Sequence, residues 1–338
     1  MAILFILLCH YVGNAFSVLW VGVDLFFVLS GFLITRILLR KSRDEHYFRN
    51  FYLRRTLRIF PLYYFALVLV LFILPSVMIS LDISYLREKQ AWFWLYMENW
   101  LFAFEGWPRE TNIIISHFWS LAIEEQYYLM WPLVVYFLRN RVGLLAVVTV
   151  LLAGIALGLR LSGTLGNPGF YTITFARMDS LLTGSFVAVA AMLRPETLKL
   201  AARRLVWPLA GIIIGVITTS SDLSYSNRFF STIGYTVLAV FFGAVVVLSF
   251  RQNTPLRRLL DCLPLKVLGR YSYGLYVFHF PVYWLFRPAL MESLSVLNAA
   301  WAAKVVAALA LLLFTFALTL FSYHLLELPF LRLKRFFE

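Results

Sequence analysis

The chain has 338 residues, of which 62% are hydrophobic, 18% aromatic and only 14% charged. One soluble core cannot bury so much apolar surface, so the composition excludes an ordinary water-soluble protein and indicates an integral membrane protein. The net charge of +13 does not predict a nucleic-acid partner, because the basic residues lie between apolar runs, and the distant Cys9 and Cys262 indicate neither a disulfide framework nor a metal site.

Ten apolar runs approach the roughly 20 residues that a membrane-spanning helix needs. They predict an all-α fold, a polytopic integral membrane protein with about ten transmembrane helices that form one domain over residues 1–338. The predicted spans are residues 2–17, 18–39, 59–79, 119–138, 143–161, 173–193, 206–219, 229–249, 271–290 and 299–324.

The basic residues set the expected orientation of these spans. With a cytoplasmic N-terminus, the loops on the inner side hold 22 of the 30 Lys and Arg residues. The positive-inside rule therefore predicts that both termini are cytoplasmic. The first run could also be the apolar part of a signal peptide, but no Lys or Arg precedes it and the basic loop follows only after the second run.

Two ionisable residues lie at membrane depth near the start of the chain. His10 is in the first run, and Asp24 is in the second, within "GVDLFFVLSGFLIT" (22–35). A tight turn near residue 17 would place both at the same depth, because each lies seven residues from it. They could then form a catalytic base with its orienting partner, or a hydrogen-bonded pair that only clips two helices together. The neighbouring Ser30 fits helix packing or a site equally well.

The third span begins with the basic stretch "FYLRRTLRIFPLYY" (51–64). Arg55 and Arg58 are spaced i, i+3, so they share one helix face. They could anchor the helix to anionic headgroups, or bind a phosphorylated donor through bidentate hydrogen bonds. The outside segment 80–117 follows, and its aromatic residues at 90–102 predict a stretch that lies along the membrane surface.

The fourth span begins with "SHFWSLAIEEQYYLMWP" (116–132). Ser120 and Glu124 share a helix face by the i, i+4 rule. Glu124 and Glu125 point about 100° apart, so we expect at most one of them to face a given cavity. Two carboxylates several residues inside an apolar segment favour a functional role over simple solvent exposure.

Two later stretches add further polar candidates. "FARMDSLLTG" (175–184) contributes Arg177 and Asp179 at the outer start of the sixth span. "GRYSYGLYVFHFP" (269–281) contributes Tyr276 and His279 around the ninth span.

These stretches, taken in order with "LFILLCH" before them and "LELPF" after them, resemble the membrane acyltransferase-3 family of O-acetyltransferases. The resemblance covers nearly the whole chain. It implies a single membrane acyltransferase domain in the bacterial cytoplasmic membrane, without the additional outside hydrolase-like domain of some relatives. It also implies acyl-CoA, usually acetyl-CoA, as co-substrate, a hydroxyl of a cell-surface glycan or lipid-linked sugar as acceptor, and no permanently bound cofactor or metal.

The resemblance carries roles to particular residues. It implies that His10 is the essential histidine, that Arg55 and Arg58 are the basic pair, and that Ser120 and Glu124 form the Ser-Leu-x-x-Glu motif. We expect catalysis from His10, Asp24 and Glu124 and donor binding from the arginine pair. The expected supporting or substrate-binding residues are Ser30, Ser120, Glu125, Arg177, Asp179, Tyr276 and His279. The acceptor hydroxyl attacks the thioester with His10 as general base, or the acyl group passes through His10 itself.

One position departs from the family pattern. The family's first motif places an arginine eleven residues before the histidine, which is two positions before Met1 in this sequence. We therefore expect that the native reading frame continues upstream through that arginine.

Two other function classes compete with acyl transfer. A lipid or glycan exporter would use the same intramembrane polar residues, but we find no internal half-repeat. A receptor or assembly partner without chemistry would leave His10, Asp24 and Glu124 without a role.

Overall fold

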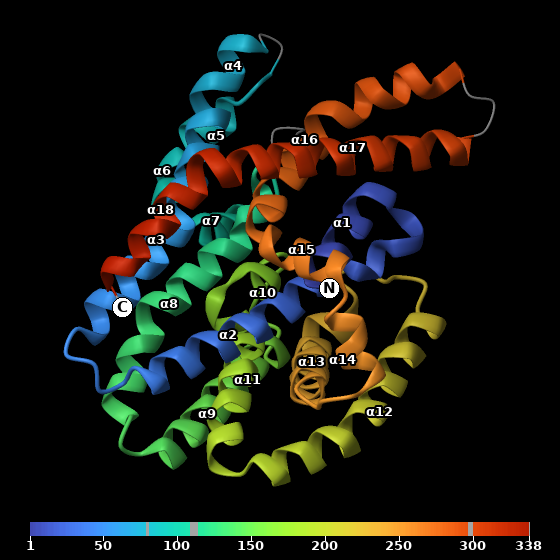
Figure 1. The fold of residues 1–338 in the computed structure, drawn as a ribbon. Helices are drawn as coiled ribbons and strands as arrows, with labels where there is room; N and C mark the ends of the chain where they lie inside the picture. Colours follow the sequence, from blue (N-terminus) through green and yellow to red (C-terminus); the bar gives the residue numbers. More distant parts are fainter. Residues whose placement is uncertain (79–80, 109–113, 297–299, 338) are drawn as a thin grey trace.

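The computed structural model describes residues 1–78, 81–108, 114–296 and 300–337, and every regular element within these ranges is a helix (Figure 1). The all-α prediction is confirmed. Seven helical segments in the described residues are long and apolar enough to cross a membrane, so the protein is a polytopic membrane protein. These are Phe16–Arg40, Tyr47–Val77, Val142–Leu161, Gly169–Leu193, Pro195–Thr219, Phe230–Ser249 and Trp301–Phe337.

The helices follow one another with short connections. The first half contains α1 (Ala2–Val12), η1 (Asn14–Val21), α2 (Gly22–Arg40), α3 (Tyr47–Val68), η2 (Leu69–Ile73), α4 (Leu74–Val77), α5 (Ser84–Glu88), α6 (Gln90–Trp94), α7 (Glu98–Glu105), η3 (Ser116–Phe118), α8 (Trp119–Leu138) and α9 (Val142–Leu161). The second half contains α10 (Gly169–Thr172), α11 (Thr174–Leu193), α12 (Pro195–Thr219), η4 (Phe230–Gly234), α13 (Tyr235–Ser249), α14 (Pro255–Leu260), α15 (Leu263–Arg270), α16 (Ser272–Ser293), η5 (Leu294–Val296), α17 (Ala300–Ser322), η6 (Tyr323–Glu327), α18 (Leu328–Arg332) and η7 (Leu333–Phe337).

Three of the ten predicted spans are not among the seven. The helix in the first run, α1, has 11 residues, which rise about 16 Å and cover about half of the hydrocarbon core. The helices α8 and α16 have 20 and 22 residues and are long enough. Their tyrosine, glutamate, histidine and proline residues lower their mean hydropathy. Residues 79 and 299, at the ends of two predicted spans, lie outside the described residues.

Helix α2 runs through the middle of the molecule and packs along α11 (Figure 1). Two glycines allow this close approach. A Cβ atom at Gly31 would overlap the carbonyl oxygen of Leu181, and one at Gly184 would overlap the carbonyl oxygen of Val28. Small residues let helix backbones approach closely in membranes, where lipid supplies no hydrophobic drive for helices to associate.

Two fully buried ion pairs join the helices of this region. Arg177 on α11 donates from Nη2 to Asp24 Oδ1 on α2 over 2.9 Å, and Arg160 on α9 donates from Nη2 to Asp179 Oδ2 over 2.7 Å. Thr236 on α13 also donates to Asp179. Breaking such a pair leaves a buried charge without compensation, so these contacts fix how α2, α9, α11 and α13 are placed.

The segment between α3 and α8 contains the stretch 90–102 that was predicted to lie along the membrane surface. The described part of the segment forms the short helices α5, α6 and α7, of which α6 packs on α3 and α7 packs on α8. Tyr63 on α3 donates to the carbonyl oxygen of Phe93, and Glu98 is fully buried. One side of the segment is therefore protein core. Residues 80 and 109–113 of the segment lie outside the described residues.

Candidate functional site

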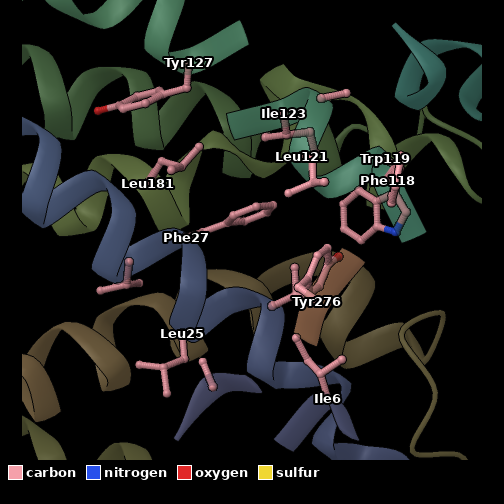
Figure 2. Packing of buried hydrophobic residues seen from close by; sticks show 14 of the residues in the cluster. Ile6, Leu25, Phe27, Phe118, Trp119, Leu121, Ile123, Tyr127, Leu181 and Tyr276 are labelled. Carbon is pink, nitrogen blue, oxygen red and sulfur yellow. The ribbon is translucent and has the colours of Figure 1, made fainter. Parts of the chain in front are cut away.

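A cavity of about 450 Å³ lies between α1, α2, α3, α8 and α16. Its apolar part includes Phe27, Leu121 and Tyr276, which lie close together in Figure 2. The polar part collects side chains that come from four different helices. The predicted site residues that line it are Ser30, Arg55, Arg58, Ser120, Glu124, Glu125 and Tyr276.

Helix α8 supplies one polar wall of the cavity. Ser120, Glu124 and Tyr128 follow at intervals of four residues, so they lie along one helix face, and all three line the cavity. The hydroxyl of Tyr128 hydrogen-bonds the hydroxyl of Ser30 on α2. The carboxyl group of Glu124 lies close to both of these hydroxyls. Glu124 therefore stands where α2 and α8 bring two hydroxyl groups together.

The expectation for the adjacent carboxylates was wrong. Both Glu124 and Glu125 line the cavity, because it borders α8 on the side facing α2 and also on the side facing α3 and α16. Oε1 of Glu125 is buried without a hydrogen-bond partner among the described residues. Its electrostatic neighbours include Arg55 and Tyr273. Glu125 therefore offers an unused acceptor to whatever occupies the cavity.

The arginine pair on α3 faces the cavity from its exposed side. Arg58 is exposed, whereas Arg55 is half-buried, with its guanidinium carbon 5.1 Å from the ring centre of Tyr128. Lys334 of η7 is an electrostatic neighbour of both arginines, because the C-terminal helices pack on α3. Glu327 and Glu124 are carboxylate neighbours of Arg58 by electrostatic interaction. The opening of the cavity is thus strongly cationic.

A pair of histidines lies beyond the cavity. Nε2 of His279 on α16 is 2.9 Å from Nδ1 of His10 on α1. Nδ1 of His279 is 2.6 Å from the carbonyl oxygen of Tyr276, one helix turn away. A carbonyl oxygen can only accept, so Nδ1 of His279 carries a proton.

The proton on Nδ1 of His279 also determines which nitrogen of His10 is protonated. In a neutral imidazole only one nitrogen carries a proton, so Nε2 of His279 accepts and Nδ1 of His10 donates. Nε2 of His10 is then the nitrogen with the free lone pair. The pair therefore leaves His10 with a basic nitrogen that its neighbour does not use.

Tyr276 connects the cavity with the histidines. Its hydroxyl lies 2.5 Å from that of Ser120 and donates to the carbonyl oxygen of His117 over 3.0 Å. The ring of His117 lies 4.9 Å from that of His279, and neither nitrogen of His117 makes a well-formed hydrogen bond among the described residues. The buried His117, His279 and Tyr276 thus form one cluster with the half-buried His10 beside the cavity.

The predicted pairing of His10 with Asp24 is wrong. Asp24 accepts from Arg177 and, over 2.9 Å, from Ser180, whereas the partner of His10 is His279. The turn occurs at Gly13, whose φ is 73°, and not near residue 17. The 3-10 helix η1 then occupies residues 14–21, so the assumed symmetry about residue 17 does not exist. Asp24, Arg177 and Asp179 belong to the buried ion pairs, away from the cavity lining.

Several residues of the site escaped the sequence reasoning. Tyr128 could have been found, because it continues the i, i+4 series of Ser120 and Glu124 on α8. Outside the site, the sequence reasoning also missed Arg160 of the buried ion pairs, although an arginine inside an apolar span is a functional or structural candidate by default. No sequence signal placed Lys334 near the arginine pair. No group of three His, Cys, Asp or Glu side chains in the described part of the chain could hold a metal ion.

Comparisons with known proteins find relatives among acyltransferases. A family profile described as "Acyltransferase domain" matches residues 1–326. The chain is 26% identical over 301 residues to O-acetyltransferase OatA of Staphylococcus aureus, covering 83% of this chain and 49% of that protein. It is 29% identical over 327 residues to the putative peptidoglycan O-acetyltransferase YrhL of Bacillus subtilis, with coverages of 85% and 48%.

A third relative is the peptidoglycan O-acetyltransferase OatA of Listeria monocytogenes, 30% identical over 292 residues, with coverages of 80% and 46%. The chain therefore spans about half the length of the curated relatives it matches. No solved structure matches it. With the family profile matched over nearly its whole length, the chain belongs to the acyltransferase-3 family of membrane acyltransferases.

Proposed function

We propose that the protein is a membrane-bound O-acyltransferase that moves an acyl group, acetyl in the first instance, from acyl-CoA to a hydroxyl of a cell-surface glycan or lipid-linked sugar. The observation that carries this proposal is one cavity that extends from the exposed Arg58 to the buried Tyr276, whose ring contacts the histidine cluster. A phosphate-binding opening and a base are the two groups that acyl transfer from CoA requires.

The donor binds through its phosphates at the cationic opening. Arg55 and Arg58 present planar guanidinium groups, which match phosphate oxygens by paired hydrogen bonds, and Lys334 adds a third positive charge. The pantetheine arm of CoA is narrow and flexible. It places the thioester in the cavity beside Ser120, Glu124 and Tyr276.

The reaction balances without an outside proton donor or acceptor. The acceptor hydroxyl oxygen bonds to the thioester carbonyl carbon, and the carbon–sulfur bond breaks. Nε2 of His10 takes the hydroxyl proton as the new bond forms, and that proton returns to the leaving thiolate. The alternative route, in which the acyl group first bonds to Nε2 of His10, uses the same free lone pair.

The acceptor class and membrane topology rest on the relatives and on the charge pattern. Two of the matched relatives are named for peptidoglycan O-acetylation, so a peptidoglycan hydroxyl is the first acceptor to test. The proposed topology has ten membrane helices, namely the seven candidate spans, α8, α16 and the shorter α1, which reaches only part of the way across, with both termini on the basic, cytoplasmic side of the bacterial membrane.

The test uses the full chain in liposomes with radiolabelled acetyl-CoA on the basic side and peptidoglycan fragments as acceptor. Label in an alkali-labile ester supports the proposal, and His10→Ala should lose it while the protein still inserts and accumulates. Translocation of the glycan without label would support an exporter instead. Equal labelling by His10→Ala would show that the assigned base is wrong.

A further inference from the structure

A second cavity of about 580 Å³ lies apart from the site, where α2, α11, α12 and α13 have their ends on one side of the bundle. Helix α2 ends at Arg40, α11 ends at Leu193, α12 begins at Pro195 and α13 ends at Ser249. All four belong to candidate membrane spans, so the cavity sits at one membrane surface. This is the side on which the basic loops gather.

The lining divides into two chemical parts. Three cations line the cavity, namely Arg36, Arg40 and Lys199, and no carboxylate does so among the described residues. Most of the other lining side chains are apolar, including Met192 and Phe250. Arg36 and Arg40 are spaced i, i+4 on α2, so their guanidinium groups point in the same direction. Lys199 is held by Glu196 over 2.7 Å, while no ion pair with a described carboxylate holds Arg36 or Arg40.

The position of α12 explains why the cavity is open. Helix α12 is the least buried of the seven candidate spans, and Figure 1 shows it at the edge of the bundle. The start of α12 lines the cavity with Pro195, Leu198 and Lys199, and the small side chains of Ala188 and Ala191 on α11 leave the space beside them unfilled. In a membrane this space faces lipid, so it is filled by something with an apolar body.

We propose that this cavity binds an anionic phospholipid of the inner leaflet, with its phosphate between Arg36, Arg40 and Lys199 and its acyl chains against the apolar lining. The charge fits, because three cations without a lining carboxylate favour a phosphate group. The place fits, because basic pockets between helices on the cytoplasmic side bind anionic headgroups. A soluble phosphate would leave the apolar part empty. The lipid would brace α12 against α2.

The experiment measures lipid binding to the purified full chain in a non-ionic detergent. Phosphatidylglycerol or phosphatidylcholine is titrated while thermal unfolding is followed, since a ligand that binds the folded state raises the unfolding temperature. The test variant is Arg36→Gln with Arg40→Gln. The matched control is Arg203→Gln with Arg204→Gln, which removes two exposed arginines of α12 that do not line the cavity.

Phosphatidylglycerol should stabilise the wild type and the control, and its affinity should fall about thirtyfold in the Arg36/Arg40 variant, as expected for two lost basic contacts. Ala191→Trp fills the cavity without changing charge and should also abolish the effect. Equal stabilisation by phosphatidylcholine, or unchanged affinity in both cavity variants, would overturn the proposal. So would equal stabilisation by glycerol 3-phosphate alone, which would identify a soluble phosphate as the ligand.

Discussion

The histidine pair gives the sharpest prediction, the effect of changing His279 to Ala. His279 is completely buried, and its Nε2 is the acceptor for Nδ1 of His10 at 2.9 Å. The change leaves the proton of His10 without a partner and frees the ring to rotate or to move its proton to Nε2. His279 does not line the cavity. Its loss should therefore act on catalysis through His10 and leave donor binding intact.

The size of the effect follows from the lost hydrogen bond. A buried donor left without a partner costs about 1–3 kcal/mol. At about 1.4 kcal/mol for each factor of ten, this corresponds to a fall in kcat of about fivefold to 150-fold. Removing the base itself, in His10→Ala, should cost about a hundredfold to ten-thousandfold. The first change should therefore be the milder one.

The decisive measurement is the double variant. If His279 works only by holding His10, then His10→Ala combined with His279→Ala should be no slower than His10→Ala alone. The assay is acetyl transfer in liposomes, normalised to the amount of folded protein. His46→Ala, at an exposed histidine before α3, is the control. Additive losses in the double variant would refute the argument, because they would mean that His279 has an independent role.

Three further predictions concern the other polar groups. Arg55→Lys or Arg58→Lys keeps the positive charge but removes the planar guanidinium group that binds phosphate through paired hydrogen bonds. In steady-state kinetics, KM for acyl-CoA should therefore rise more than KM for the acceptor. Asp24→Asn weakens the buried pair with Arg177, and because breaking such a pair costs about 3–5 kcal/mol, thermal unfolding should show lower stability while kcat of the folded fraction is kept. Glu124→Gln keeps hydrogen-bonding capacity at a carboxylate that faces hydroxyls and arginines, so kcat should fall less than in His10→Ala.

Much of the fold could be predicted because a membrane chain shows its helices in its hydropathy. Long apolar runs with basic loops between them predicted the helical class and most of the helix positions. The outside segment could not be predicted in the same way. Aromatic residues suit a membrane interface and a protein core equally well, and only the contacts of Phe93 and Glu98 with α3 show that this segment is partly core.

Site residues that lie on one helix could be predicted from their spacing. Contacts between residues of two different helices could not. Ser120 with Glu124, and Arg55 with Arg58, have fixed spacings on one helix, and all four line the same cavity. Pairing between helices depends on where each turn lies. The chain turns at Gly13, which has a positive φ, and not near residue 17 as the prediction assumed. The partner of His10 is therefore His279, which lies 269 positions away in the sequence.

The buried charges therefore divide into two groups that sequence alone treats as one. Asp24 with Arg177, and Arg160 with Asp179, form buried ion pairs between helices, so their charges serve helix packing, although Oδ2 of Asp24 and Nε and Nη1 of Arg177 have no hydrogen-bond partner among the described residues. At the cavity, no ion pair between described residues holds Glu125. Glu125 keeps an acceptor without a partner, and the tautomer assignment leaves Nε2 of His10 free. Unpaired polar groups that line or adjoin a cavity are the groups that a substrate can reach and pair. Depth in the membrane selects both groups of buried charges, and only the ion pairs and the cavity lining separate them.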